Sequence, residues 1–149
     1  MKKLIFIMAL CGAMLFCSCK SGDNSTAGSN VNFSVAKNYF FKNGAVIPDN
    51  PKISSADEFQ KFFGMAAVMG KDGTPTAIDF SKQFVLAVVL PVTDVYTEIQ
   101  PVDVNVINGE LVYEYSVKTG EKMTYSMRPM ALIVLDREYD GLKVKMVEK

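Results

Sequence analysis

The chain has 149 residues, of which 16 are basic, 16 are acidic and none is histidine. The absence of histidine removes the commonest general base and metal ligand, and the balanced charge provides no clustered basic face for nucleic acid. Because phosphate-loop, dinucleotide and nucleophile-elbow motifs are also absent, we expect no cofactor, no metal site and no nucleic-acid partner.

The first 18 residues have the pattern of an export signal. Two lysines precede thirteen uncharged residues, Leu4–Phe16. This length fits the roughly 7–15-residue core of a signal peptide and falls short of the about 20 residues that span a bilayer. Cys19 follows two small residues, as signal-peptidase cleavage requires. The site resembles the lipobox of bacterial lipoproteins, with Leu15 one place further upstream than usual.

Acylation of Cys19 is therefore predicted, with palmitate-type chains that hold the mature protein on a membrane. No cysteine follows Cys19, so the mature chain cannot form an internal disulfide, and acylation gives this lone exported thiol a role. Lys20 takes the place of the aspartate that retains lipoproteins in the inner membrane, which favours the outer membrane and leaves its face open. An ordinary secretory signal is the alternative.

The mature chain is predicted to contain one domain behind a tether. Residues 19–32 are small and polar and read as a flexible tether, and residues 33–149 form a single β-rich domain. The first predicted strand lies within residues 35–44, which are rich in aromatic and β-branched side chains. Ser55 and Glu58 have the spacing of a capping box, so a helix should run from Ala56 to Phe63 or one turn beyond.

After Gly73 the sequence predicts only strands. Residues 83–91 are a continuous apolar run, typical of a strand that is buried on both faces. Val102, Val104 and Val106 alternate with polar residues and predict a half-buried strand that ends at the hairpin signal Asn108-Gly109.

The partner strand should place alternate side chains on one face and then turn at Lys118–Glu121. The next strand should face Met123, Tyr125 and Met127 inward by the same rule. Residues 131–136 predict another core strand, and residues 142–148 alternate with lysines as an edge strand does.

These elements predict an α+β fold. The expected architecture is a mostly antiparallel β meander of about six to seven strands, curled or barrel-like, packed with one amphipathic helix.

Two segments carry candidate partner-binding residues. Thr93, Asp94 and Tyr96 lie in a polar break between two strong strands, which is either a contact loop or a connector. Arg128 lies in a segment rich in methionine and tyrosine, which is either an adaptable binding surface or a core strand that ends at Pro129 with Arg128 in solvent.

Carboxylates are the only candidates for catalysis. They lie in predicted turns and on the polar sides of strands, where solvated charge is expected, and we therefore predict that the protein is not an enzyme. The residues are Asp79, Asp94, Glu98, Asp103, Glu110 and Glu114.

A family likeness is carried by residues 55–135. Asp79-Phe80-Ser81-Lys82 enters an apolar strand, and a valine-rich strand, a hairpin and a strand passing Pro129 follow. In this order the segment resembles the C-terminal domain family of the protease-complex subunit PrcB. That family usually has Gly-Gly-Tyr near the first β connection, of which only Tyr96 is retained. The resemblance implies a non-catalytic partner of a peptidase.

Two functions follow as hypotheses. The first is an envelope lipoprotein that binds another exported protein as a regulator or inhibitor of a peptidase. In size and export the chain is similar to small lipoprotein inhibitors of streptopain-like cysteine peptidases. The second is a lipocalin-like carrier of a small molecule or lipid, with a cavity lined by Tyr113, Tyr115, Met123, Tyr125 and Met127.

Overall fold

The computed structural model describes residues 28–66, 69–70 and 72–149. Cys19 and the predicted signal peptide lie outside these residues. The described part has an α+β fold, as predicted, in which strands dominate and one short α-helix packs against them. No helix in these ranges is long and apolar enough to cross a membrane.

The elements of the described chain are mostly short strands, with two much longer strands near the middle. They are β1 (Ser29–Asn30), β2 (Ser34–Val35), β3 (Tyr39–Phe41), β4 (Lys52–Ile53), α1 (Ala56–Phe62), β5 (Phe63–Met65), β6 (Gln83–Val89), β7 (Thr93–Ile107), β8 (Glu110–Met127), β9 (Met130–Asp136), a 3₁₀ turn (Arg137–Tyr139) and β10 (Lys143–Glu148).

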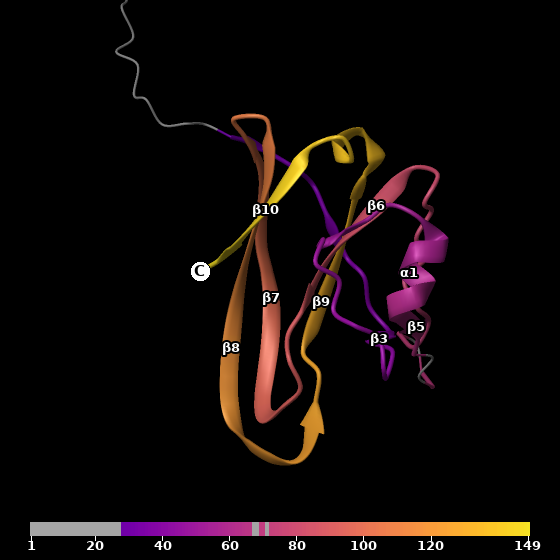
Figure 1. The fold of residues 1–149 in the computed structure, drawn as a ribbon, viewed down its shortest axis with the longest axis vertical. Helices are drawn as coiled ribbons and strands as arrows, with labels where there is room; N and C mark the ends of the chain where they lie inside the picture. The colour runs from indigo at the N-terminus through magenta and orange to yellow at the C-terminus, as the bar shows by residue number, and fades with distance from the viewer. Residues whose placement is uncertain (1–27, 67–68, 71) are drawn as a thin grey trace, which may run out of the picture.

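The strands form three sheets that stack as layers. The outer sheet has the order β1-β7-β8-β10, the middle sheet has the order β2-β9-β6-β4, and β3 pairs with β5. Figure 1 shows β7 and β8 on one flank, β6 and β9 in the middle, and α1 with β3 and β5 on the opposite flank. The middle sheet is therefore covered on both faces.

Two hydrophobic cores follow from this layering, one on each face of the middle sheet. Successive side chains of a strand point to opposite faces, so β6 sends Leu86 toward the outer sheet and Val85 toward α1, and each is 0% exposed. The neighbouring strand β9 does the same with Ile133 and Leu132. The prediction that the apolar run at residues 83–91 forms a strand buried on both faces is confirmed.

The predicted barrel-like meander is wrong in two respects. The chain leaves the middle sheet after β6, builds the long pair β7–β8 in the outer sheet and returns to pair β9 with β6. Neither four-stranded sheet closes on itself. The mostly antiparallel pairing that the sequence predicts is confirmed, since β10 with β8 is the one parallel pair among the described strands. The prediction of an edge strand at residues 142–148 is confirmed, because β10 ends the outer sheet.

No turn interrupts β8 at Lys118–Glu121, where the sequence predicts one. Thr119 pairs with Thr97 and Lys122 with Val95, so the ladder continues through the segment with one extra residue on β8. Gly120 allows a close contact instead of a turn, since a Cβ there would lie 3.1 Å from Cδ1 of the Tyr96 ring. The two predicted strands are thus one strand of 18 residues.

The alternation predicted along β7 fails at Val102, which is 51% exposed. Pro101 pairs with Tyr115 and Asp103 with Glu114, so Val102 is an extra residue on β7. A bulge of this kind shifts the buried face by one position. The buried positions accordingly change from Thr97 and Ile99 before the bulge to Val104 after it.

The local signals of the sequence are confirmed. The Ser55 side chain accepts a hydrogen bond from the Glu58 amide at 3.3 Å and caps α1, which ends one residue earlier than expected. Asn108 and Gly109 have φ angles of 52° and 78°, as the predicted two-residue hairpin turn requires.

The folded part begins before the predicted domain start at residue 33. Asn30 pairs with Asn105 of β7, and the Val31 amide donates to the Val104 carbonyl at 2.8 Å. Val31 is only 1% exposed, so it belongs to the core between the two large sheets. The end of the predicted tether is therefore part of the outer sheet, and residues 19–27 lie outside the described residues.

Candidate functional site

The outer edge of β8 leaves part of its backbone without a neighbouring strand in the outer sheet. On this side β10 pairs with β8 only from Glu110 to Tyr115. Of the strands in the described part, none pairs with that side from Ser116 to Met127. We call residues 116–127 the free edge. An unpaired edge offers a row of N–H and C=O groups to an extended peptide.

The direction of these backbone groups follows from the last contact of β10. The Lys149 amide donates to the Tyr115 carbonyl at 2.9 Å, so the backbone groups of Tyr115 point away from β7. The register between Tyr115 and Thr119 is regular, and the direction of backbone groups alternates along a strand. Val117 and Thr119 therefore present their N–H and C=O groups at the free edge.

Three of the predicted contact residues lie beside the free edge, but not in a loop. Thr93, Asp94 and Tyr96 all belong to β7, and the connector is only residues 90–92. Asp94 forms an ion pair of 3.0 Å with Lys122 of β8. These residues lie in a strand and not in a loop, since β7 begins at Thr93, which pairs with Met127, and their contact with a partner stays a prediction.

Arg128 lies apart from these three residues. It follows the end of β8, and its guanidinium carbon is 5.2 Å from the centre of the Phe41 ring, in the layer beyond the middle sheet. This cation–π contact ties the β8–β9 connection to β3. Arg128 is thus half-buried against Phe41, whereas one of the two alternatives placed it in solvent, and its role in binding a partner stays a prediction.

The tyrosines and methionines expected to line a carrier cavity do not share one. Tyr113 is fully buried between the two large sheets, whereas Tyr125 is 64% exposed on β8. Met123 and Met127 are half-buried near the far end of that strand. The inward orientation predicted for Tyr125 is wrong, because the outer part of β8 extends past the core.

Four of the six carboxylates considered for catalysis, Asp79, Asp94, Asp103 and Glu114, have polar or charged partners. Asp103 and Glu114 are directly opposite each other on β7 and β8. Asp103 accepts a hydrogen bond of 2.6 Å from the Asn30 amide, and Glu114 forms an ion pair of 2.9 Å with Lys149. Neither lines one of the two described pockets. Within residues 28–66, 69–70 and 72–149, no three His, Cys, Asp or Glu residues group as a metal site would require.

The motif Asp79-Phe80-Ser81-Lys82 is a tight turn into β6. The Asp79 carboxylate accepts hydrogen bonds from the Ser81 hydroxyl at 2.6 Å and the Ser81 amide at 3.0 Å. These bonds lower the pKa of Asp79, and Lys82 adds to the effect. The motif therefore leads the chain into β6, and its Phe80 lines the cleft described next.

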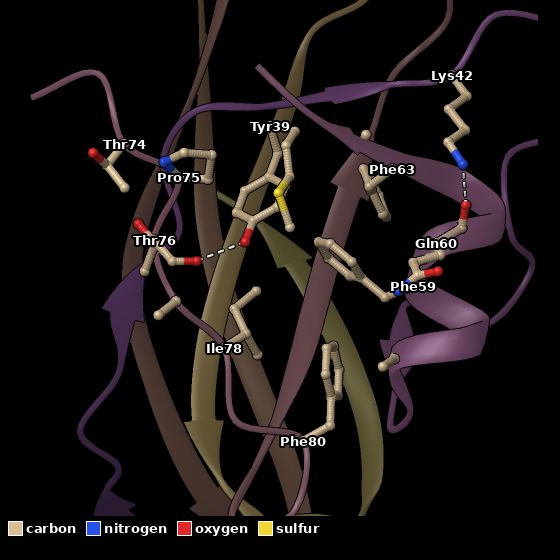
Figure 2. Close-up of a pocket in the computed structure, with 14 residues that line it drawn as sticks. Tyr39, Lys42, Phe59, Gln60, Phe63, Thr74, Pro75, Thr76, Ile78 and Phe80 are labelled. Carbon is tan, nitrogen blue, oxygen red and sulfur yellow. Dashed lines mark hydrogen bonds between the residues drawn. The ribbon is translucent and has the colours of Figure 1, made fainter. Parts of the chain in front are cut away.

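A second candidate site is an apolar cleft on the α1 side of the middle sheet. Its volume is about 580 Å³, within the roughly 300–1,000 Å³ typical of ligand pockets. Figure 2 shows Phe59 of α1 and Phe63 of β5 facing Ile78 and Thr76 across it. The Tyr39 and Phe59 rings meet edge to face, with centroids 5.1 Å apart.

One wall of the cleft is an irregular segment, residues 74–78, that is fastened to the start of β3. Asn38 has a positive φ of 62°, and its side-chain amide donates to the Thr74 carbonyl at 3.0 Å. The Lys37 amide donates to the Thr76 hydroxyl at 2.9 Å, and the Tyr39 hydroxyl donates to the Thr76 carbonyl at 2.6 Å (Figure 2). Burial raises the pKa of Tyr39, so its hydroxyl stays protonated and remains a donor.

Sequence reasoning found neither the free edge nor the cleft. The cleft brings together separate segments, among them Tyr39 and Thr76, which are 37 residues apart in the chain and which no local pattern joins. The free edge exists because β10 pairs with β8 only as far as Tyr115. The one available signal was the exposed alternation of residues 142–148, which identified an edge strand but not its partner.

Comparisons with known proteins add no relative: the chain matches no family model, no curated protein and no solved structure. The resemblance to the PrcB family therefore stays a prediction.

Proposed function

We propose that the chain is a non-catalytic envelope lipoprotein whose domain binds another exported protein, and that this partner is a peptidase that it regulates or inhibits. The observation that carries the proposal is the free edge. On the side away from β7, the backbone of residues 116–127 pairs with none of the described strands, and the exposed side chains of Tyr96 and Tyr125 lie nearby.

A free edge suits a peptidase because strand addition is a general way to recognise extended chain. The edge is held on a scaffold, since β8 pairs with β7 from Glu110 to Thr119 with one bulge and again at Lys122 and Met127. A preformed binding strand loses little conformational entropy when it binds, which favours affinity. The resemblance to the PrcB family supports the same kind of partner.

The composition of the edge favours a different protein over a second copy of this chain. Lys118 and Lys122 are exposed along it, and lysines on an edge strand oppose pairing between identical edges. Irregular register near Gly120 breaks the flat geometry that self-association needs. A partner with acidic or polar side chains fits this edge better.

Blocking the free edge is expected to weaken binding. Thr119→Pro removes an N–H that points away from β7, so the ladder to β7 is kept while strand addition is obstructed. We expect the inhibition constant against a co-exported cysteine peptidase to rise about tenfold or more, which corresponds to about 1.4 kcal/mol. Inhibition kinetics with streptopain-like peptidases measure this effect.

The matched control is Thr119→Val, which keeps the backbone donor and should leave the inhibition constant within about twofold. Circular dichroism and thermal unfolding check that both variants fold. Equal inhibition by the proline and valine variants would contradict the free edge as the binding site. Absence of inhibition and of direct binding by the unmodified protein would end the proposal of a peptidase partner.

The membrane anchor raises the concentration of the domain near any partner in the same envelope. Acylation of Cys19 remains the prediction, with the outer membrane as destination. Cys19→Ala is expected to move the protein from the membrane to the soluble fraction, because acyl chains contribute about 0.8 kcal/mol per buried CH₂. Fractionation and intact-mass measurement test this, with Cys17→Ala as the control that should stay on the membrane. An unmodified native mass would refute the anchor.

A further inference from the structure

The side chains that line the α1-side cleft favour an apolar ligand. Nine of the fourteen lining residues are aromatic or apolar: Tyr39, Ala56, Phe59, Phe63, Met65, Pro75, Ala77, Ile78 and Phe80. The polar groups of the far wall already bond within the protein, since Tyr39 donates to the Thr76 carbonyl and the Thr76 hydroxyl accepts from the Lys37 amide. A ligand part that enters between these walls gains by burying carbon, because apolar burial contributes in proportion to area.

The charge among the described lining residues of the cleft is positive. Among the described residues that line it, Lys42 is the only one with a charged side chain. Figure 2 shows Lys42 at one end of the site, with its ammonium group directed at the carbonyl of Gln60 in α1. An ammonium group has three donors, so this contact leaves two for an anion. The half-buried position of Lys42 reduces screening by solvent.

An apolar cleft with a cation at one end fits an amphiphile with an anionic head. We propose that the α1-side cleft binds a long-chain fatty acid, with its alkyl chain between Phe59 and Ile78 and its carboxylate at Lys42. Met65 is 73% exposed and lines the same cleft. Its flexible thioether can pack against an alkyl chain of variable position. This site is separate from the free edge, which lies on the outer sheet.

Calorimetry on the mature chain, residues 19–149, tests the proposal with laurate and 1-dodecanol below their aggregation limits. We expect laurate to bind with one molecule per chain and about tenfold more tightly than the neutral alcohol, because only laurate makes a charge-assisted contact. Lys42→Met keeps the apolar stem and removes the charge, and it should abolish the difference between the two ligands. Lys61→Met is the matched control, since Lys61 is an exposed lysine of α1 that does not line the cleft.

Filling the cleft locates the binding site. Ala56→Phe and Ala77→Phe place a ring in the cleft from two different segments, and each should weaken laurate binding about tenfold or more. Both positions are exposed, so at least one variant should keep the thermal midpoint of the parent chain. Absence of laurate binding, equal affinity for laurate and dodecanol, or undiminished binding by the folded filling variants would each overturn the proposal. Because these variants leave β8 unchanged, peptidase binding should survive in all of them.

Discussion

Replacing Leu86 by alanine is expected to lower the free energy of unfolding by about 2–5 kcal/mol. Leu86 is 0% exposed and lies in the middle sheet, opposite Ile133 of β9 and Lys52 of β4. Its side chain packs in the core between the two large sheets, where Tyr113 and Val104 also lie. A cavity there cannot collapse easily, because strands enclose it on both sides. Urea unfolding of the two proteins measures the difference.

The second face of the middle sheet supplies the matched test. Val85 is also 0% exposed but packs in the core beneath α1. Val85→Ala removes about two methylene equivalents and should lower the free energy of unfolding by about 1.5–3 kcal/mol. Val144 of the edge strand β10 is half-buried, and Val144→Ala should cost less than either. A loss below about 0.5 kcal/mol for Val85→Ala would mean that α1 and β3 do not cover the sheet.

Signals that act within a few residues predicted this fold well. Ser55 caps a helix because its hydroxyl reaches an amide three residues away. Asn108-Gly109 forms the hairpin turn because both residues tolerate positive φ. The apolar run in β6 was recognisable because a strand covered on both faces needs no polar alternation.

The same local signals failed where pairing between distant residues prevailed. Lys118–Glu121 has the composition of a turn, yet β7 supplies a continuous ladder and Tyr96 packs over Gly120. In the sequence, Val102 fits the alternation of Val104 and Val106 with polar residues, but the bulge beside Pro101 turns its side chain outward. Sheet order and the parallel pairing of β10 depend on contacts between segments far apart in the chain, which no periodicity encodes.

The candidate sites were less predictable than the fold for a physical reason. Binding by a free edge uses backbone groups, and every residue type has these groups, so no motif marks it. The cleft is lined by apolar side chains, and in the sequence these cannot be told from ordinary core residues. Phe59 and Phe63, for example, both line the cleft and belong to the core. Residue types mark a site only when its chemistry needs a rare side chain, as the acylation proposed for Cys19 would.

Tyr113 is the residue of the core whose replacement should stabilise the protein. It is 0% exposed, and its hydroxyl oxygen has no hydrogen-bond partner among the described residues. A buried polar group without a partner costs about 1–3 kcal/mol. Tyr113→Phe removes the hydroxyl and keeps the ring contact with Tyr115, whose centroid lies 5.8 Å away. We expect the free energy of unfolding at pH 7 to rise by about 1 kcal/mol or more.

Alkaline pH should widen the gap between the two proteins. Burial raises the pKa of Tyr113, and the neighbouring Tyr115 adds to the effect. The folded state therefore keeps this proton above pH ~10, where an unfolded tyrosine loses it. Because the unfolded state then binds fewer protons, stability falls as pH rises, by up to about 1.4 kcal/mol per pH unit for one group. Tyr113→Phe has no hydroxyl to ionise at this position, so it does not lose stability in this way.

Urea unfolding between pH 8 and 11 separates the two contributions of Tyr113. The advantage of Tyr113→Phe should be constant up to about pH 9 and grow from about pH 10 upward, since only the parent chain loses the Tyr113 term. Tyr125→Phe is the control, because Tyr125 is 64% exposed and its replacement should change neither the stability nor its pH dependence. A destabilised Tyr113→Phe variant would show that the hydroxyl has a favourable partner. An advantage that stays constant to pH 11 would show that the folded state also releases this proton.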